Sequence, residues 1–220
     1  MGTRQRRSAQ ETAQFRSPTT VYLDHSGLEE SDLAWLAPLE RLTLWSVTLP
    51  PGLLAQLPRL SWLDIRGGSG TSLSIVEGCT HLRYLSINQV RGLQDLSTVA
   101  SMDNLIYVAV YGQPQLTRMP SFARLRQLRR ADLGSLKGLR DISGLFAAPA
   151  LEELVLMKMV RLSAADIDLL AGYKPLRRFT WFGEDVPDRV WVPVRDRLAL
   201  PPAKLEFPEE WFRARGLPVP

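Results

Sequence analysis

One spacing recurs along most of the chain: an apolar residue is followed by apolar residues three and five positions later, as in LRYLSI at residues 82–87. Eight segments follow this spacing with conservative changes, and successive segments begin 21 to 25 residues apart. Their first residues are Pro18, Leu39, Leu60, Leu82, Leu105, Leu128, Leu151 and Leu176. A period of this length indicates one supersecondary unit that is stacked on copies of itself.

Each of the eight segments predicts a β-strand with two different faces. Because side chains alternate along a strand, the fourth and sixth places of the repeat point inward, and the third, fifth and seventh point out of the opposite face. Each strand is followed by a return segment, after which the next strand runs in the same direction. The eight strands should therefore form one parallel sheet.

The return segments carry a second pattern that supports the same register. The residues six and three positions before an anchor are apolar in every repeat, if the partly polar Tyr173 is included. Those six positions before it are Leu33, Leu54, Val76, Val99, Phe122, Leu145 and Leu170, and those three before it are Leu36, Leu57, Cys79, Met102, Leu125, Ala148 and Tyr173. A spacing of three places both residues on one side of a short helical turn that packs against the strands.

These motifs resemble leucine-rich repeats, and GLRDISGLFAAPALEELVL at residues 138–156 is similar to the short repeats of bacterial internalin-type proteins. The resemblance covers residues 18 to about 182. It implies an α/β solenoid curved into an arc, with about eight parallel strands on the concave face and short helical or irregular returns on the convex face. The asparagine that this family usually has at the ninth place is absent from all eight repeats, so we expect irregular turns.

Three regions follow from the pattern. Residues 1–16 are polar and contain four arginines, which predicts a disordered basic tail or, alternatively, an arm for an acidic partner. Residues 17–182 hold the repeats. Residues 183–220 break the period and contain seven prolines. Because a solenoid needs its last apolar layer covered, we expect this segment to be a C-terminal cap, with a separate binding segment as the alternative.

Composition restricts the location and the chemistry. The only cysteine, Cys79, rules out an internal disulfide, and no run of 18 apolar residues is present. The first residues lack the apolar core of a secretory signal. We therefore expect a cytoplasmic protein without a membrane span.

Catalytic motifs are missing from the sequence. His25 and His81 fall about three strands apart, and Cys79 occupies an inward position. No phosphate-binding glycine loop or metal-spaced pair of cysteines or histidines is present. We expect no cofactor, no metal and no enzymatic activity. An enzyme that uses the carboxylates of the C-terminal segment, Glu206, Glu209 and Glu210, is the weakest alternative.

The outward face of the sheet holds the candidate binding residues. Trp62, Tyr84 and Tyr107 are consecutive at the third place of the repeat, and equivalent places on adjacent strands lie about 4.8 Å apart. Tryptophan, tyrosine and arginine predominate at binding hot spots because they combine contact area with directional polar groups. The predicted partner-binding residues are Arg41, Trp45, Trp62, Asp64, Arg66, Tyr84, Tyr107, Tyr111 and Arg130.

The sequence thus favours a non-catalytic module that binds a protein through its concave face. By analogy, such a module could serve as an inhibitor or an immunity-type partner. Two alternatives stay open at this point. In the first, the aromatic residues merely shield a flat sheet. In the second, the chain binds a nucleic acid, with exposed tyrosines that stack on its bases. The arginines near the sixth repeat would then contribute positive charge: Arg124, Arg126, Arg129, Arg130 and Arg140.

Overall fold

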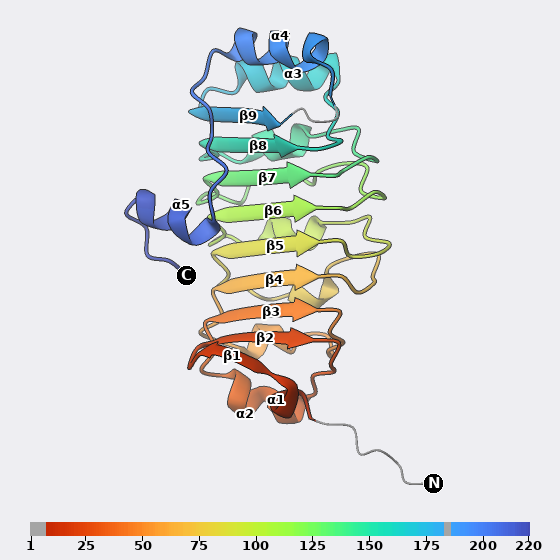
Figure 1. The fold of residues 1–220 in the computed structure, drawn as a ribbon, viewed down its shortest axis with the longest axis vertical. Helices are drawn as coiled ribbons and strands as arrows, with labels where there is room; N and C mark the ends of the chain where they lie inside the picture. Colours follow the sequence, from red (N-terminus) through yellow and green to blue (C-terminus); the bar gives the residue numbers. More distant parts are fainter. Residues whose placement is uncertain (1–7, 183–185) are drawn as a thin grey trace.

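A single sheet runs through the computed structural model, which describes residues 8–182 and 186–220 (Figure 1). Within these residues the sheet has nine strands in chain order. Eight are parallel: β2 (Thr20–Asp24), β3 (Arg41–Trp45), β4 (Trp62–Arg66), β5 (Tyr84–Asn88), β6 (Tyr107–Tyr111), β7 (Arg130–Gly134), β8 (Glu153–Met157) and β9 (Arg178–Phe182). The third-place residues pair from strand to strand, so the predicted architecture and the predicted strand register are confirmed.

The N-terminal end of the solenoid differs from the prediction. Residues 8–16 were assigned to a disordered tail, but they form the short helix α1 (Ala9–Thr12) and most of strand β1 (Gln14–Ser17). β1 pairs with β2 in antiparallel orientation, and the buried Ala9 packs into the apolar core. The segment thereby covers the first rung of the sheet. Residues 1–7 lie outside the described residues.

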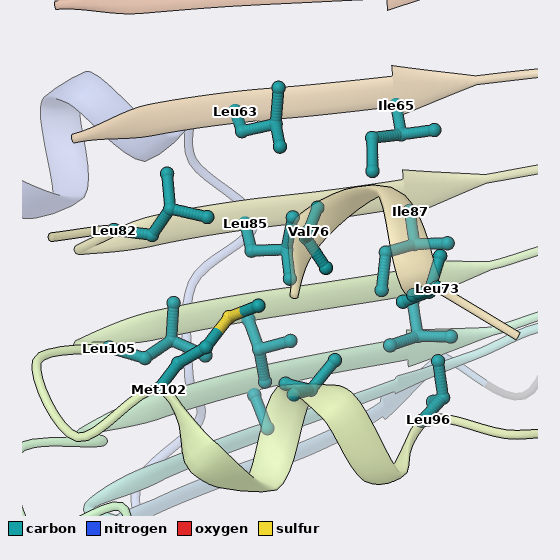
Figure 2. Packing of buried hydrophobic residues seen from close by; sticks show 14 of the residues in the cluster. Leu63, Ile65, Leu73, Val76, Leu82, Leu85, Ile87, Leu96, Met102 and Leu105 are labelled. Atoms are coloured by element: carbon teal, nitrogen blue, oxygen red, sulfur yellow. The ribbon is translucent and has the colours of Figure 1, made fainter. Parts of the chain in front are cut away.

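The core lies between the sheet and the return segments, as the repeat pattern requires (Figure 2). Inward residues of β4 and β5, such as Leu63 and Leu85, face apolar residues of the returns, such as Val76 and Met102. Of the fourteen return residues, all are buried except Leu33 and Tyr173, which are partly exposed. The helical returns are η1 (Glu30–Asp32), α2 (Leu33–Leu36), η2 (Leu54–Gln56), η3 (Ser74–Val76), η4 (Ser97–Ser101), η5 (Ser143–Ala147) and α3 (Ala164–Gly172).

The turns after the strands are more regular than expected. In six consecutive repeats the eighth-place residue has a positive φ, and its N–H donates to the seventh-place carbonyl of the next strand or its immediate neighbour. These residues are His25, Ser46, Gly67, Gln89, Gly112 and Ser135. A backbone ladder thus continues the sheet into the turn, and the expectation of irregular turns is wrong at this place. Side-chain asparagines are not needed because the backbone supplies the hydrogen bonds.

The C-terminal segment separates into two parts that lie against different faces. Helix α4 (Asp188–Leu198) packs on α3 and β9 at the end of the solenoid, with Val194 buried. The chain then passes in extended form along β9, where the Phe179 N–H donates to the carbonyl of Pro201. Helix α5 (Pro208–Ala214) follows beside the starts of the middle strands β5 and β6, far from α4 (Figure 1). Only the α4 part covers the last rung.

Candidate functional site

The aromatic column at the third place is assembled in the predicted register, but the chain covers it. Only 8% of Trp62, 5% of Tyr84 and 2% of Tyr107 is exposed. Two aromatic residues of α5, Trp211 and Phe212, are fully buried against them and form one apolar cluster with them. The prediction that these three residues present an open surface is therefore wrong. The rings are shielded by a segment that the repeat pattern does not describe.

The rings of this cluster meet in close, specific geometries. The centroids of Trp62 and Tyr84 are 3.9 Å apart in a stacked arrangement, and Tyr107 meets Tyr84 edge to face at 5.2 Å. Trp211 approaches Tyr107 in a second edge-to-face contact, also at 5.2 Å. Such pairs stabilise an interface beyond the area that they bury, by about 0.5–1.5 kcal/mol each. These contacts attach α5 to the sheet at this place.

A buried ionic network lies at the β7–β8 end of the aromatic column. The side chain of Arg130 is fully buried, and its Nε donates to Asp132 Oδ1 at 2.8 Å. Its Nη1 lies 3.3 Å from Glu153 Oε2, and its Nη2 donates to the carbonyl of Lys204 at 3.0 Å. Arg130, Asp132 and Asp64 were all expected on the open face, but all three are buried. Their positions are correct, whereas their exposure was not predicted.

The tail supplies the second half of this network. Trp211 Nε1 donates to Glu153 Oε2 at 3.1 Å, and Arg215 Nε donates to Glu153 Oε1 at 2.8 Å. Arg215 also pairs with Glu206 at 3.1 Å and lies over the ring of Trp211 at 4.6 Å. Glu153 therefore receives donors from both the sheet and α5. An ion pair that is hydrogen-bonded on every side avoids the large cost of an unpaired buried charge.

The protonation equilibria reflect this burial. Burial raises the pKa of Asp132, although the positive charge and hydrogen bond of Arg130 oppose the shift. Burial alone would lower the pKa of Arg130, but the charge and hydrogen bond of Asp132, together with the charges of Tyr107 and Glu153, outweigh burial and raise that pKa. Burial also raises the pKa of Tyr84 and of Tyr107, whose hydroxyl donates to Asp132 at 2.5 Å. The raised pKa values of Arg130, Tyr84 and Tyr107 lie further from neutral pH than the ordinary values of these groups.

An arginine lies at the other end of the aromatic column. Arg41 stands over the ring of Trp62, with 4.8 Å between the guanidinium carbon and the ring centroid. It pairs with Glu209 of α5 at 3.4 Å, and both side chains are partly exposed. The third-place residues Arg41, Trp62, Tyr84, Tyr107, Arg130 and Glu153 are called the closed column below.

A second row on the same face is left accessible. Trp45, Arg66, Asn88 and Tyr111 are the seventh-place residues of β3 to β6 and pair with one another in sequence across the sheet. Trp45 is 42% exposed, and the other three are partly exposed. Arg66 Nε donates to the buried carboxylate of Asp64 at 2.7 Å, and this hydrogen bond raises the pKa of Arg66. These four residues are called the open stripe below.

One glycine makes room for a ring of the open stripe. A Cβ atom at Gly134 would lie 2.6 Å from Cδ2 of Tyr111, which is too close for real atoms. Gly134 has no positive φ, so its missing side chain matters here for space rather than for backbone freedom. Tyr111 therefore lies across the neighbouring strand, where its ring is held by the sheet.

The other residues that the sequence singled out do not form a site. His25 contacts Asp24 at the surface. Cys79 is buried, which raises the pKa of its thiol to about 11. Of the arginines near the sixth repeat, Arg124 pairs with Asp103 at 3.3 Å and Arg140 donates to backbone carbonyls, while Arg130 is buried. Arg126 and Arg129 are exposed, and Arg124 and Arg126 line one hollow together with Asp103.

Sequence reasoning missed the residues that close the column. Glu153, Trp211 and Arg215 were not among the candidates, yet they hold α5 in place. A signal was present: the third-place column contains an arginine next to a glutamate, and the tail contains a Trp-Phe pair followed by an arginine. Complementary charges and aromatic residues on two segments can indicate that the segments contact each other. No repeat spacing relates the tail to the sheet, however, so the sequence does not predict which residues pair.

The repeat register, the parallel ladder and the layered core together define a leucine-rich repeat solenoid. No helix among the described residues is long and apolar enough to cross a bilayer.

Comparisons with known proteins give only a distant likeness. No protein-family model and no curated protein matches the chain. Among solved structures, internalin C2 of Listeria monocytogenes is similar over 74% of this chain and 80% of its own, with 19% identity and a TM-score of 0.45. The internalin inlF of the same organism is similar over 80% of this chain and 70% of its own, with 17% identity and a TM-score of 0.36. The assignment of the fold therefore rests on the repeat and the sheet themselves.

Proposed function

We propose that the chain is a non-catalytic module that binds a protein partner through the open stripe. The observation that carries the proposal is the exposed Trp45 in a row with Arg66 and Tyr111 on a rigid sheet. These residue types provide most of the binding energy in protein interfaces. Because Arg66 is hydrogen-bonded to Asp64 and the ring of Tyr111 packs across Gly134, little side-chain entropy would be lost at these two residues when a partner binds.

The charges near the open stripe favour a protein over a nucleic acid. Arg66 is already neutralised by Asp64, and Asp24 is exposed at the neighbouring seventh place of β2. Phosphates would meet acidic groups there instead of a basic groove. Within the tail, the three carboxylates proposed for catalysis have structural partners: Glu206 pairs with Arg215, Glu209 with Arg41, and Glu210 accepts from the N–H of Phe207.

Alanine substitution of the open stripe tests this function. We expect Trp45→Ala and Tyr111→Ala to weaken partner capture by at least about tenfold each, because hot-spot truncations cost about 2 kcal/mol or more. Leu169→Ala is the matched control, since Leu169 is an equally exposed apolar residue on α3. Affinity capture from cell extract with quantitative mass spectrometry gives the readout. If every captured protein binds these variants as well as the wild type, the open stripe is not the interface.

The same experiment addresses the finer part of the proposal. We infer an inhibitor or immunity-type role in the cytoplasm, in keeping with the single, unpaired cysteine. The partner that depends on Trp45 should then be an enzyme or toxin whose activity falls when the purified chain is added. A partner whose activity does not change would contradict that role but leave protein binding intact.

A further inference from the structure

Residues 204–220, called the tail segment, pack on the concave face through contacts of the kind that a separate ligand would make. Among the described residues, every hydrogen bond that joins residues 205–220 to the sheet runs between side chains: Glu209 with Arg41, and Trp211 and Arg215 with Glu153. The carbonyl of Lys204 accepts from Arg130, and Glu206 forms an ion pair with Arg130 at 3.7 Å. The remaining contacts are made between rings and by Leu217 and Val219, which pack against the same cluster. No strand of the sheet depends on backbone pairing with α5. The attachment therefore resembles an interface more than a layer of the fold.

The solenoid core is independent of this attachment. The main apolar cluster runs from Ala9 to Val194 and includes no residue of α5. Trp211 and Phe212 belong to a second cluster with four residues, Trp62, Tyr84, Ile106 and Tyr107. The surface between α5 and the sheet is also rich in charge, and interfaces within a chain that are polar in this way allow relative motion more readily than apolar ones. Water can solvate Glu153 and Arg215 again when they separate.

The closed column has a polarity that specifies what fits on it. At one end, Arg41 forms an ion pair with an acidic residue. In the middle, the rings of Trp62, Tyr84 and Tyr107 pack against a pair of aromatic rings. At the other end, Glu153 accepts hydrogen bonds from an indole N–H and an arginine. In the tail segment these partners are Glu209, Trp211 with Phe212, and Arg215, within two turns of helix. Charge complementarity at both ends and apolar contact between them define a helix-in-groove mode of recognition.

We propose that the closed column is a binding site for a short amphipathic helix of another protein, and that the tail segment is its resting occupant. The helix has an acidic residue, an aromatic pair and an arginine in that order. This inference goes beyond the proposed function, because it concerns the closed column and not the open stripe. A partner helix must displace a tail segment that is tethered to α4 by the connector at residues 199–203. Tethers of this kind give effective concentrations of roughly millimolar order, so access is restricted without being blocked.

Exchange of a labelled peptide into the full-length chain tests the proposal. The probe is a fluorescein-labelled synthetic peptide of residues 204–220, and fluorescence anisotropy measures its binding. We expect weak binding to the wild-type chain and binding at least about tenfold tighter to the full-length Trp211→Ala variant, whose own tail competes less well. The same peptide with Trp211 and Phe212 both changed to alanine should not bind either chain.

Two controls keep the experiment decisive. Leu205→Ala, at a residue that is 55% exposed, should leave peptide binding unchanged, and Trp45→Ala should also leave it unchanged because the open stripe is a separate surface. Equal binding of the peptide to the wild type and to a folded Trp211→Ala variant would overturn the proposal.

If Trp211→Ala fails to fold, hydrogen exchange on the wild-type chain decides instead. We expect the amides of α5 to exchange at least about tenfold faster than those of β4 to β8, through opening that leaves the solenoid intact. Exchange of α5 only by global unfolding, at the rate of the central strands, would show that the tail segment is a permanent layer of the fold and would overturn the proposal.

Discussion

The closed column and the open stripe are built from the same residue types on the same strands, but they have different roles. Both contain a tryptophan, a tyrosine and an arginine that pairs with an aspartate two residues away on the same strand. α5 covers the first row and leaves the second accessible. A side chain that points out of the sheet is therefore not necessarily exposed to solvent. A row of aromatic residues on a sheet predicts that something covers it, without saying whether that is a partner or the chain itself.

The two aspartate–arginine pairs should differ most. Arg130→Met leaves Asp132 and Glu153 buried without their shared cation, which should lower the free energy of unfolding by about 3–5 kcal/mol. Arg66→Met, the matched change in the open stripe, should cost less than Arg130→Met, because Arg66 is partly exposed although its partner Asp64 is buried. Urea denaturation of both variants measures the difference. Equal losses would mean that burial does not distinguish the two rows.

Truncation of the buried Trp211 should also lower the stability more than truncation of the accessible Trp45. Trp211 is fully buried and donates to Glu153, so Trp211→Ala should destabilise the protein by about 3 kcal/mol or more. Trp45→Ala should change the stability by about 1 kcal/mol or less, while it weakens partner capture. Thermal unfolding followed by circular dichroism provides the stability readout. A Trp45→Ala variant as unstable as Trp211→Ala would contradict the assignment of Trp45 to an accessible surface.

Alkaline pH should destabilise the fold through groups that burial keeps protonated. The pKa of Cys79 is raised from 9.0 to about 11, so the folded chain retains this proton where the unfolded chain releases it. Stability should therefore fall as the pH rises from about 9 to 11, by about 2 kcal/mol. Above pH 10, the raised pKa values of Tyr84 and Tyr107 in the closed column act in the same direction.

Urea denaturation as a function of pH tests this expectation. The Cys79→Ala variant should lose the part of the decline that lies between pH 9 and 10, where the tyrosines do not yet contribute. A wild-type profile that stays flat up to pH 11 would show that these groups titrate equally in the folded and unfolded chains.

The smallest expected effect sharpens the description of the open stripe. Gly134→Ala places a methyl group 2.6 Å from the ring of Tyr111, which should cost about 1 kcal/mol and move the ring. Gly172→Ala is the control, because a Cβ there has no heavy atom within 4 Å. Calorimetry gives the stability, and capture of the partner shows whether the ring position matters. Unchanged stability and capture in Gly134→Ala would mean that the glycine does not position Tyr111.

Local periodicity was sufficient to predict most of the fold. The strands, their parallel order and the buried return residues follow from a spacing that every repeat restates, as Leu63, Val76 and Leu85 illustrate. The candidate site was predicted only in part: the third-place and seventh-place rows lie where they were expected, but the covering of the first by Trp211 and Phe212 was not foreseen. β1 was missed for a similar reason, since it is a single strand outside the repeat.

The sequence by itself determined the stacking unit, the direction of each side chain and the neighbours of each strand residue, because these depend on contacts within one period. The tertiary structure alone decided that Glu153 meets Arg215, 62 residues away, and that α5 closes one row of the concave face and spares the other. Contacts between a repeating surface and a unique segment occur once. Whether these contacts form depends on the path of the extended connector between α4 and α5, and the spacing of the repeats does not predict that path.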